Sequence, residues 1–150
     1  MKSFDYLRGK NVPFKEIHLS EVPKSSQDVE RLYGCPLHQV LKTLVFVSEN
    51  KPVVVVVPGD RRASLSKLRS LTGVNSLRIA KPDEVLSISG YTVGGVTPFG
   101  IESDVIMAID SSVFEMDMVN IGSGKAEIGI ELSSQKLKDI WDGIIGDICE

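Results

Sequence analysis

The sequence has few of the residues that build metal centres and disulfides. Its 150 residues include two cysteines and two histidines. Cys35 and Cys149 lie far apart in the sequence, which favours reduced thiols in a cytoplasmic protein over a disulfide scaffold. His18 and His38 belong to no Cys/His cluster with metal-ligand spacing, so the sequence predicts no metal site.

Long hydrophobic runs are also missing. The longest, residues 53–57, is bracketed by Pro52 and Pro58 and is far too short to span a bilayer. Asp5 and Arg8 interrupt any apolar stretch at the N-terminus, so we expect no signal peptide. With 42% hydrophobic and 25% charged residues, the composition is that of a soluble globular protein. The length predicts one domain, residues 1–150, with a core that needs no disulfides.

The common catalytic motifs are missing too. There is no Gly-x-Ser-x-Gly nucleophile motif and no dinucleotide-binding fingerprint. Residues 122–125, Gly-Ser-Gly-Lys, resemble the end of a phosphate-binding loop. That loop would need glycine where Val119 stands and Ser or Thr where Ala126 stands, so we reject it. An enzyme with this sequence would therefore show no nucleophile, metal or dissociable cofactor.

The net charge of −3 conceals an uneven distribution. Residues 1–41 have a net charge of +1, residues 42–81 of +6 and residues 82–150 of −10. Such asymmetry indicates a face that binds a polyanion, although charges distant in sequence can also mix on a folded surface. The acidic overall composition argues against a general duplex-DNA binder.

Helices and strands are expected to alternate without a clean βαβ repeat, which predicts a mixed α+β fold. Strands are predicted over residues 14–19, 41–47, 53–57, 77–79, 104–109, 116–121 and 126–132. Helices are predicted over residues 4–8, from Ser25 or Ser26 to Gly34, over residues 64–71, from Pro82, and from Ser133 through Trp141. Residues 41–47 and 53–57 should form a hairpin of two buried strands.

Lys42 is the first candidate functional residue. It lies at the start of a strongly apolar strand, between Leu41 and Leu44. A cation in such a strand must be paired or face an open cleft, and a positioned lysine is a good contact for one phosphate. The alternative is an ordinary exposed lysine on the polar side of the strand.

The second candidate is the segment 90–100, which contains four glycines and one proline. Glycine lets the backbone adopt positive φ and approach a ligand closely. A wall of backbone N–H groups can hold an ester carbonyl or an attacking water without any catalytic side chain. The alternative is a plain structural turn.

Five sequence blocks in order resemble the YbaK/EbsC family, the free-standing aminoacyl-tRNA deacylases related to the editing insertion of bacterial prolyl-tRNA synthetase. These blocks are Lys42-Thr43-Leu44-Val45-Phe46, residues 57–62 followed by Lys67-Leu68, Gly-x-x-x-Pro at residues 94–98, Ile109-Asp110, and Gly122-Ser123-Gly124. The resemblance implies a YbaK-like α+β fold, in which helices surround a barrel-like mixed sheet.

The resemblance also implies an activity, the hydrolysis of the ester that joins a mischarged amino acid to the terminal adenosine of a tRNA. Lys42 would contact the phosphate of the terminal nucleotide. A loop with Gly94, Gly95 and Pro98 would position the ester and either a water or the substrate's own reactive group. No metal or cofactor is implied. The partners would be the tRNA acceptor end and an aminoacyl-tRNA synthetase, with the protein a monomer or weak homodimer. The implied substrate-binding residues are Ser20, Thr43, Thr97, Gly100, Asp110, Gly122, Ser123 and Gly129.

The sequence departs from the specialised branches of that family at pocket positions. The cysteine-specific branch has Tyr, Ser and Asp where this chain has Ser20, Gly122 and Gly129. The alanine-specific branch usually has Asn where Thr43 stands. We therefore expect a deacylase for a small or hydroxylated amino acid such as Ser, Thr or Ala. The alternatives are a tRNA- or synthetase-binding module that has lost hydrolysis, and a small-molecule esterase or interaction domain using the same cleft.

Overall fold

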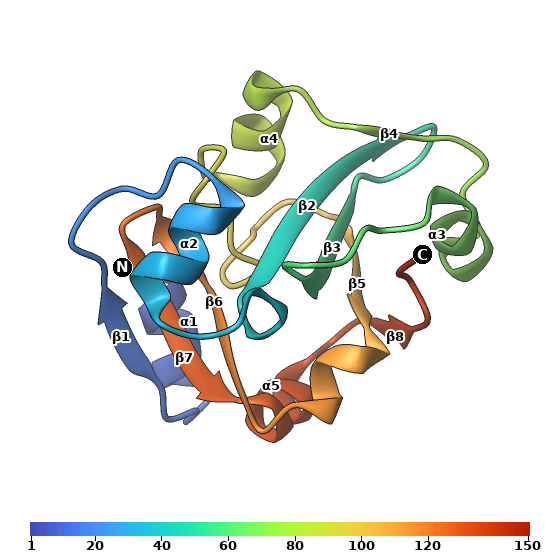
Figure 1. Cartoon of the computed structure of the whole chain (residues 1–150). Helices are drawn as coiled ribbons and strands as arrows, with labels where there is room; N and C mark the ends of the chain where they lie inside the picture. Colours follow the sequence, from blue (N-terminus) through green and yellow to red (C-terminus); the bar gives the residue numbers. More distant parts are fainter.

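The computed structural model describes residues 1–150, apart from the side chain of Ser26 (Figure 1). The helices are α1 (Lys2–Gly9), α2 (Ser26–Tyr33), α3 (Leu65–Thr72), α4 (Pro82–Ser89) and α5 (Ser134–Ile140), with the 3-10 turns η1 (Leu37–Gln39) and η2 (Ser111–Glu115). The strands are β1 (Lys15–His18), β2 (Leu41–Ser48), β3 (Val53–Pro58), β4 (Leu77–Ile79), β5 (Ile106–Asp110), β6 (Met118–Lys125), β7 (Ile128–Ser133) and β8 (Ile144–Gly146). Among the described residues, no helix is long and apolar enough to cross a membrane.

A five-stranded sheet has the strand order β4-β2-β3-β5-β8. The β2–β3 hairpin forms its antiparallel centre, whereas β3–β5 and β5–β8 are parallel. Every residue of β3 from 53 to 57 is fully buried. Because both faces of this strand are covered, its sequence is a continuous valine run without alternation. Figure 1 shows α3 on one side of this sheet and α4 on the other.

A three-stranded antiparallel sheet has the order β1-β7-β6. Its buried side chains Ile121, Ile130 and Leu132 pack with Leu41 and Val56 of the first sheet, so the main core lies between the two sheets. The β6–β7 pairing shifts register between Gly122 and Lys125.

The predicted mixed α+β class is confirmed, but the strands do not close into a barrel. The sheets remain open and meet at a single bridge between Val40 and Asn120. Beyond that bridge no described strand of the smaller sheet pairs with β2.

The predicted helices and hairpin are present, with small shifts at their ends. Ser25 is the N-cap of α2, where its hydroxyl accepts the N–H of Asp28, and Gly34 ends this helix in the left-handed region at φ 68°. The last helix ends at Ile140, before Trp141. The short strand β8 was not predicted, since three residues carry no usable alternation.

Candidate functional site

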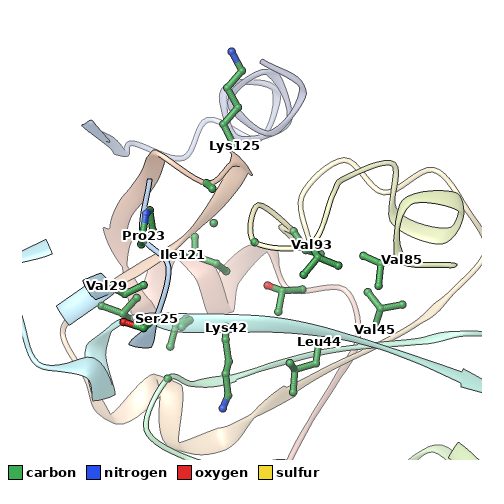
Figure 2. Close-up of a pocket in the computed structure, with 18 of the residues that line it drawn as sticks. Pro23, Ser25, Val29, Lys42, Leu44, Val45, Val85, Val93, Ile121 and Lys125 are labelled. Atoms are coloured by element: carbon green, nitrogen blue, oxygen red, sulfur yellow. The ribbon is translucent and has the colours of Figure 1, made fainter. Parts of the chain in front are cut away.

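A cavity of about 450 Å³ lies where β2 of the larger sheet approaches β6 of the smaller one. Its walls come from α2, the first half of β2, α4, the 90–100 segment and the β6–β7 hairpin. Figure 2 shows Val29 of α2, Val85 of α4, Val93 of the 90–100 segment and Ile121 of β6 around this space. Parts of the chain distant in sequence thus form one site.

The edge of β2 that faces the cavity is open. Residues 42–44 pair with β3 on one side, and no other described strand pairs with them on the other side. The C=O of Val45 points to this outer side, where it accepts the N–H of Ala80 at 2.9 Å. In an antiparallel strand the outward-facing backbone groups alternate, so the N–H and C=O of Thr43 also point outward, toward the cavity. A ligand can therefore hydrogen-bond to this strand edge.

Lys42 and Thr43 flank this open edge. Figure 2 shows the Lys42 side chain leaving β2 on the side away from Val93 and Ile121, together with Leu44. Side chains alternate along a strand, so Thr43 projects to the opposite side. The Thr43 Oγ1 is buried and has no hydrogen-bond partner among the described groups. Both residues border the cavity, and the Lys42 ammonium lies on the opposite side of β2 from Val93 and Ile121.

The half-buried Lys42 makes no ion pair within the described part of the chain. Its ammonium lies near the buried thiol of Cys149. Burial raises the pKa of that thiol to about 11, and the charges of Arg61 and Lys42 oppose the shift. Lys42 thus provides an uncompensated positive charge beside the open edge of β2, on the side of α3.

The loop of residues 94–98, hereafter the 94–98 loop, lies directly on β6. A Cβ atom at Gly95 would lie 2.8 Å from the carbonyl oxygen of Gly124, and one at Gly122 would lie 2.5 Å from that of Val96. Gly94 has φ 96°, a conformation that disfavours any side chain, and it lines the cavity. Three predicted residues, Gly94, Gly95 and Gly122, therefore let this loop reach the cavity.

Two further predicted residues, Thr97 and Ser123, are fully buried and hold the backbone in place. The Thr97 Oγ1 accepts the N–H of Phe99 at 3.3 Å. The Ser123 hydroxyl lies 2.5 Å from the carbonyl oxygen of Ile128 and also accepts the N–H of Lys125 at 3.2 Å. Thr97 thus fixes the conformation of the 94–98 loop, and Ser123 fixes the end of β6. Neither residue lines a cavity of the described structure.

The remaining predicted residues lie elsewhere. Pro98 and Gly100 line a second cavity of about 260 Å³ on the other side of the 94–98 loop, with Tyr6 and Trp141. Ser20 is exposed after the end of β1 and lines neither cavity. The structure therefore does not bring these residues together with Lys42.

Asp110 is buried at the end of β5, where it binds backbone and not open space. Its Oδ1 accepts the N–H groups of Ile148 and Cys149 at 2.8 and 3.0 Å, and its Oδ2 lies 3.7 Å from Arg61. Burial raises the pKa of this carboxyl group, but the hydrogen bonds from Ser112, Ile148 and Cys149 outweigh burial, and the net pKa lies below its ordinary value. The geometry is that of an anchor for the C-terminal segment.

Sequence reasoning did not single out Tyr33 as a site residue. It falls within the helix predicted to end at Gly34, and it lines the cavity from the last turn of α2. Burial raises its pKa to about 12, so it is a neutral phenol at physiological pH. Lys125 and the exposed side chains of Ile79 and Val93 also border the cavity. An apolar helical pattern cannot distinguish such wall residues from core.

The cavity has a distinctive chemical character. Its ionisable side chains are Lys42, Lys125 and Tyr33, and among the described residues that line it there is no carboxylate, imidazole or thiol. Most of the remaining wall consists of valine, leucine and isoleucine. The polar groups of the wall are the hydroxyls of Ser25, Thr43 and Tyr33 and backbone amides, and the Ser25 hydroxyl already caps α2. Figure 2 shows the Lys42 and Lys125 side chains directed away from the cavity, so their positive charge lies at its border. This combination suits a ligand with an apolar part inside and an anionic part at the border.

The chain is similar to a known protein family and to individual proteins. Residues 21–140 match the model of the aminoacyl-tRNA editing domain. Proline--tRNA ligase of Citrifermentans bemidjiense is 32% identical over 133 residues, which is 84% of this chain and 23% of that protein. The chain thus spans about a quarter of the length of the ligases it matches.

Two further matches cover most of both chains. An Enterococcus faecalis protein with the provisional name Cys-tRNA(Pro)/Cys-tRNA(Cys) deacylase EbsC is 26% identical over 140 residues, 91% of this chain and 85% of its own. A crystal structure provisionally described as a trans-editing enzyme for prolyl tRNA synthetase superimposes with a TM-score of 0.89 at 24% identity, over 99% of this chain and 95% of that chain. The structural likeness shows a shared fold.

Proposed function

The chain belongs to the aminoacyl-tRNA editing domain family, and from that premise we propose that it is a trans-editing aminoacyl-tRNA deacylase. It hydrolyses the ester between a mischarged amino acid and the terminal adenosine of a tRNA. The observation that carries the proposal is one cavity that joins the open edge of β2 to the 94–98 loop. The open edge of β2 offers hydrogen bonds and the nearby charge of Lys42, and the 94–98 loop offers a backbone that can surround an ester.

Lys42 binds the phosphate of the terminal nucleotide in this proposal. Its ammonium is half-buried, and no described carboxylate neutralises it. It belongs to the segment 42–81, which has a net charge of +6. A lysine held beside a cleft contacts phosphate as a point charge. Binding of tRNA should therefore weaken as salt rises, since phosphate contacts release counterions.

Thr43 and Gly94 hold the reacting end of the substrate. The outward N–H, C=O and unpartnered Oγ1 of Thr43 can hydrogen-bond to the terminal ribose or the aminoacyl group. Backbone N–H groups of the 94–98 loop stabilise the negative charge that develops on the ester oxygen, apart from that of Gly95, which donates to the Thr92 carbonyl oxygen at 3.0 Å. Gly94 is suited to this task because no side chain separates its backbone from the cavity.

The reaction is an addition followed by an elimination. A water held in the cavity forms a bond to the ester carbon, and the carbonyl electrons move to the oxygen. The oxyanion collapses, the bond to the ribose oxygen breaks, and that oxygen takes up a proton originating from the water. The products are a free amino acid and an uncharged tRNA. Orientation and backbone electrostatics carry the catalysis.

A tRNA- or synthetase-binding module without hydrolysis is the second candidate. One observation favours it, namely that the described cavity wall offers no imidazole, carboxylate or thiol to act as a general base. In such a module the same cavity would bind the acceptor end of tRNA without cleaving the ester.

A deacylation panel tests both candidates. The protein is incubated with tRNA(Pro) carrying Cys, Ala, Ser or Thr and with tRNA(Ala) carrying Ser or Gly, beside Lys42→Ala. The matched control is Lys51→Ala, which removes the same charge from a half-exposed lysine that pairs with Asp104 at 3.2 Å. We expect one or a few esters to be hydrolysed, with activity lost in Lys42→Ala and kept in Lys51→Ala.

Two other results would change the assignment. No hydrolysis of any ester, combined with salt-sensitive tRNA binding, would replace the deacylase by the binding module. Full hydrolysis by Lys42→Ala would show that Lys42 does not bind the terminal phosphate. It would also favour an esterase that acts on uncharged substrates.

A further inference from the structure

Tyr33 and position 129 compete for the same space. A Cβ atom at Gly129 would lie 2.6 Å from Cζ of Tyr33 and closer still to the phenol oxygen. Any residue other than glycine at 129 would therefore displace the Tyr33 ring. The cysteine-specific branch has Asp where this chain has Gly129. In this structure the phenol of Tyr33 occupies the space that a side chain at position 129 would need.

The Tyr33 hydroxyl lies beside the 94–98 loop. Gly129 pairs directly with Gly122 across the β6–β7 hairpin. Directly opposed residues of antiparallel strands project to the same face, with Cβ positions about 5 Å apart. On that face the Tyr33 phenol covers Gly129, and the Val96 carbonyl covers Gly122. The phenol and the loop are therefore neighbours over one pair of glycines.

The hydroxyl is free to bind a ligand. At neutral pH the phenol keeps its proton, because burial raises its pKa to about 12, and it can both donate and accept a hydrogen bond. Burial and the nearby Cys35 are the causes of this pKa shift, and no hydrogen bond from another described group contributes. The cavity that Tyr33 lines is mainly apolar, with Val29 and Val96 among its wall residues. Tyr33 thus places one polar group in an apolar pocket.

We infer that Tyr33 is a specificity-determining residue, whose hydroxyl hydrogen-bonds the side chain of the bound amino acid. This inference rests on the proposed function, in which the 94–98 loop holds the ester. The ring limits the size of the side chain, and the hydroxyl favours a small side chain that carries a hydroxyl over one that ends in a methyl group. A site built around such a hydrogen bond discriminates against the analogue that lacks it.

The test compares seryl and alanyl substrates, which differ by one hydroxyl. Hydrolysis of seryl- and alanyl-tRNA(Pro) is measured as kcat/KM, and binding is measured with stable amides of serine and alanine on 3′-amino-3′-deoxyadenosine. Tyr33→Phe removes only the hydroxyl and keeps the ring. The matched control is Tyr6→Phe, which makes the same change outside this cavity, on α1.

We expect the wild type to prefer seryl over alanyl groups. Tyr33→Phe should lose about tenfold in kcat/KM and affinity for the seryl forms, the effect of one neutral hydrogen bond, and change the alanyl forms by less than about twofold. Tyr6→Phe should leave both unchanged. Gly129→Ala moves the hydroxyl without removing it and should reduce the same preference.

The two measurements separate this inference from the proposed hydrolysis. If the amides bind with a seryl preference that Tyr33→Phe abolishes, while neither ester is cleaved, the specificity role stands and the deacylase assignment falls. Equal effects of Tyr33→Phe on seryl and alanyl forms, or no seryl preference in the wild type, would overturn the specificity role even where both esters are hydrolysed. If Tyr33 served only to pack its ring, Tyr33→Phe would affect the seryl and alanyl forms equally, because the ring is retained.

Discussion

Lys42 and Thr43 are neighbours in β2, and their side chains leave the strand on opposite sides of one open edge. A ligand bound along that edge meets an ammonium on one side and a hydroxyl on the other. The backbone N–H and C=O of Thr43 lie between them. Under the proposed function, a substrate must therefore reach both sides of β2 to contact both side chains.

Thr43→Val should separate binding from stability. The Thr43 Oγ1 has no partner among the described groups, so its replacement by a methyl group breaks no internal hydrogen bond and should leave the melting temperature unchanged. If the hydroxyl binds substrate, kcat/KM for deacylation should fall by about tenfold. Thermal unfolding and steady-state kinetics measure the two effects.

Thr97→Val is the control for that experiment. The Thr97 Oγ1 accepts the N–H of Phe99 in a fully buried site, so its loss should lower the free energy of unfolding by about 1 kcal/mol. A Thr43→Val protein with lowered stability and unchanged kinetics would show that Thr43 is a packing residue.

Gly122→Ala should push the 94–98 loop away from β6. The new methyl group would lie 2.5 Å from the carbonyl oxygen of Val96, so either the loop or the strand must move. Overpacking of this kind costs about 1–3 kcal/mol of stability. We also expect a loss of deacylation beyond the loss of folded protein, because the loop leaves its position.

Gly9→Ala is the matched substitution, since no atom lies within 4 Å of a Cβ there and φ is not positive. It should leave the kinetics unchanged and raise stability by up to about 1 kcal/mol, because alanine replaces glycine at the end of α1 without a clash. Gly122→Ala with wild-type kinetics would mean that the position of the loop does not govern the reaction.

Asp110→Ala should destabilise the protein without acting on the cavity. The change leaves the buried N–H groups of Ile148 and Cys149 without their acceptor and should cost about 2–4 kcal/mol in chemical denaturation. Ligand affinity per folded molecule should stay at the wild-type level. A selective loss of affinity would instead support the predicted substrate-binding role.

The stability contribution of Asp110 should depend on pH. Its folded pKa lies below the ordinary value of 3.8, so the contribution is complete above that value and is lost as the pH falls through the folded pKa. Denaturation at pH 7 and in that acidic range should therefore show a smaller difference between wild type and Asp110→Ala in acid.

Glu84 should titrate at unusually low pH. Both of its carboxylate oxygens accept hydrogen bonds from Arg78, at 2.7 and 2.8 Å, and its Oε1 also accepts the N–H of Lys81. These bonds lower its pKa from 4.5 to about 2. A carboxyl chemical-shift titration should give that midpoint, and Arg78→Ala should raise it toward the ordinary value.

The sign of the linked stability follows from this depressed pKa. The contribution of the Arg78–Glu84 contact is present above pH 4.5 and disappears as the pH falls toward 2. A Glu84 midpoint near 4.5 in the wild type would show that the contact does not persist in solution.

The parts of the fold with strong periodicity or capping could be predicted. The valine run predicts β3 because a strand buried on both faces needs no polar residue, and Gly34 predicts the end of α2 because only glycine adopts its left-handed backbone easily. The open shape of the sheets could not be predicted, since it depends on which strands pair at a distance. The predicted strand 116–121 also ends before β6 does, because Gly122 and Gly124 interrupt the apolar pattern that indicates a strand.

The site was predicted in part. Lys42, Thr43, Gly94 and Gly122 line one cavity, in agreement with the expectation that they share a site, and their roles in the reaction remain predictions. Asp110 was expected to bind substrate because Ile109-Asp110 is one of the blocks that resemble the family, and its contacts with backbone N–H groups cannot be seen in the sequence. Tyr33 was missed, since its relation to Gly129 exists only after α2 packs on β7.

The unpaired stretch of β2 also has a consequence for solubility. A bare strand edge next to a run of valines is a template on which further chains can add, and such growth leads to aggregates. Here α2, α4 and the 94–98 loop surround that edge and leave room for a small ligand. The walls that define the pocket therefore also keep a second copy of the chain from adding to the sheet.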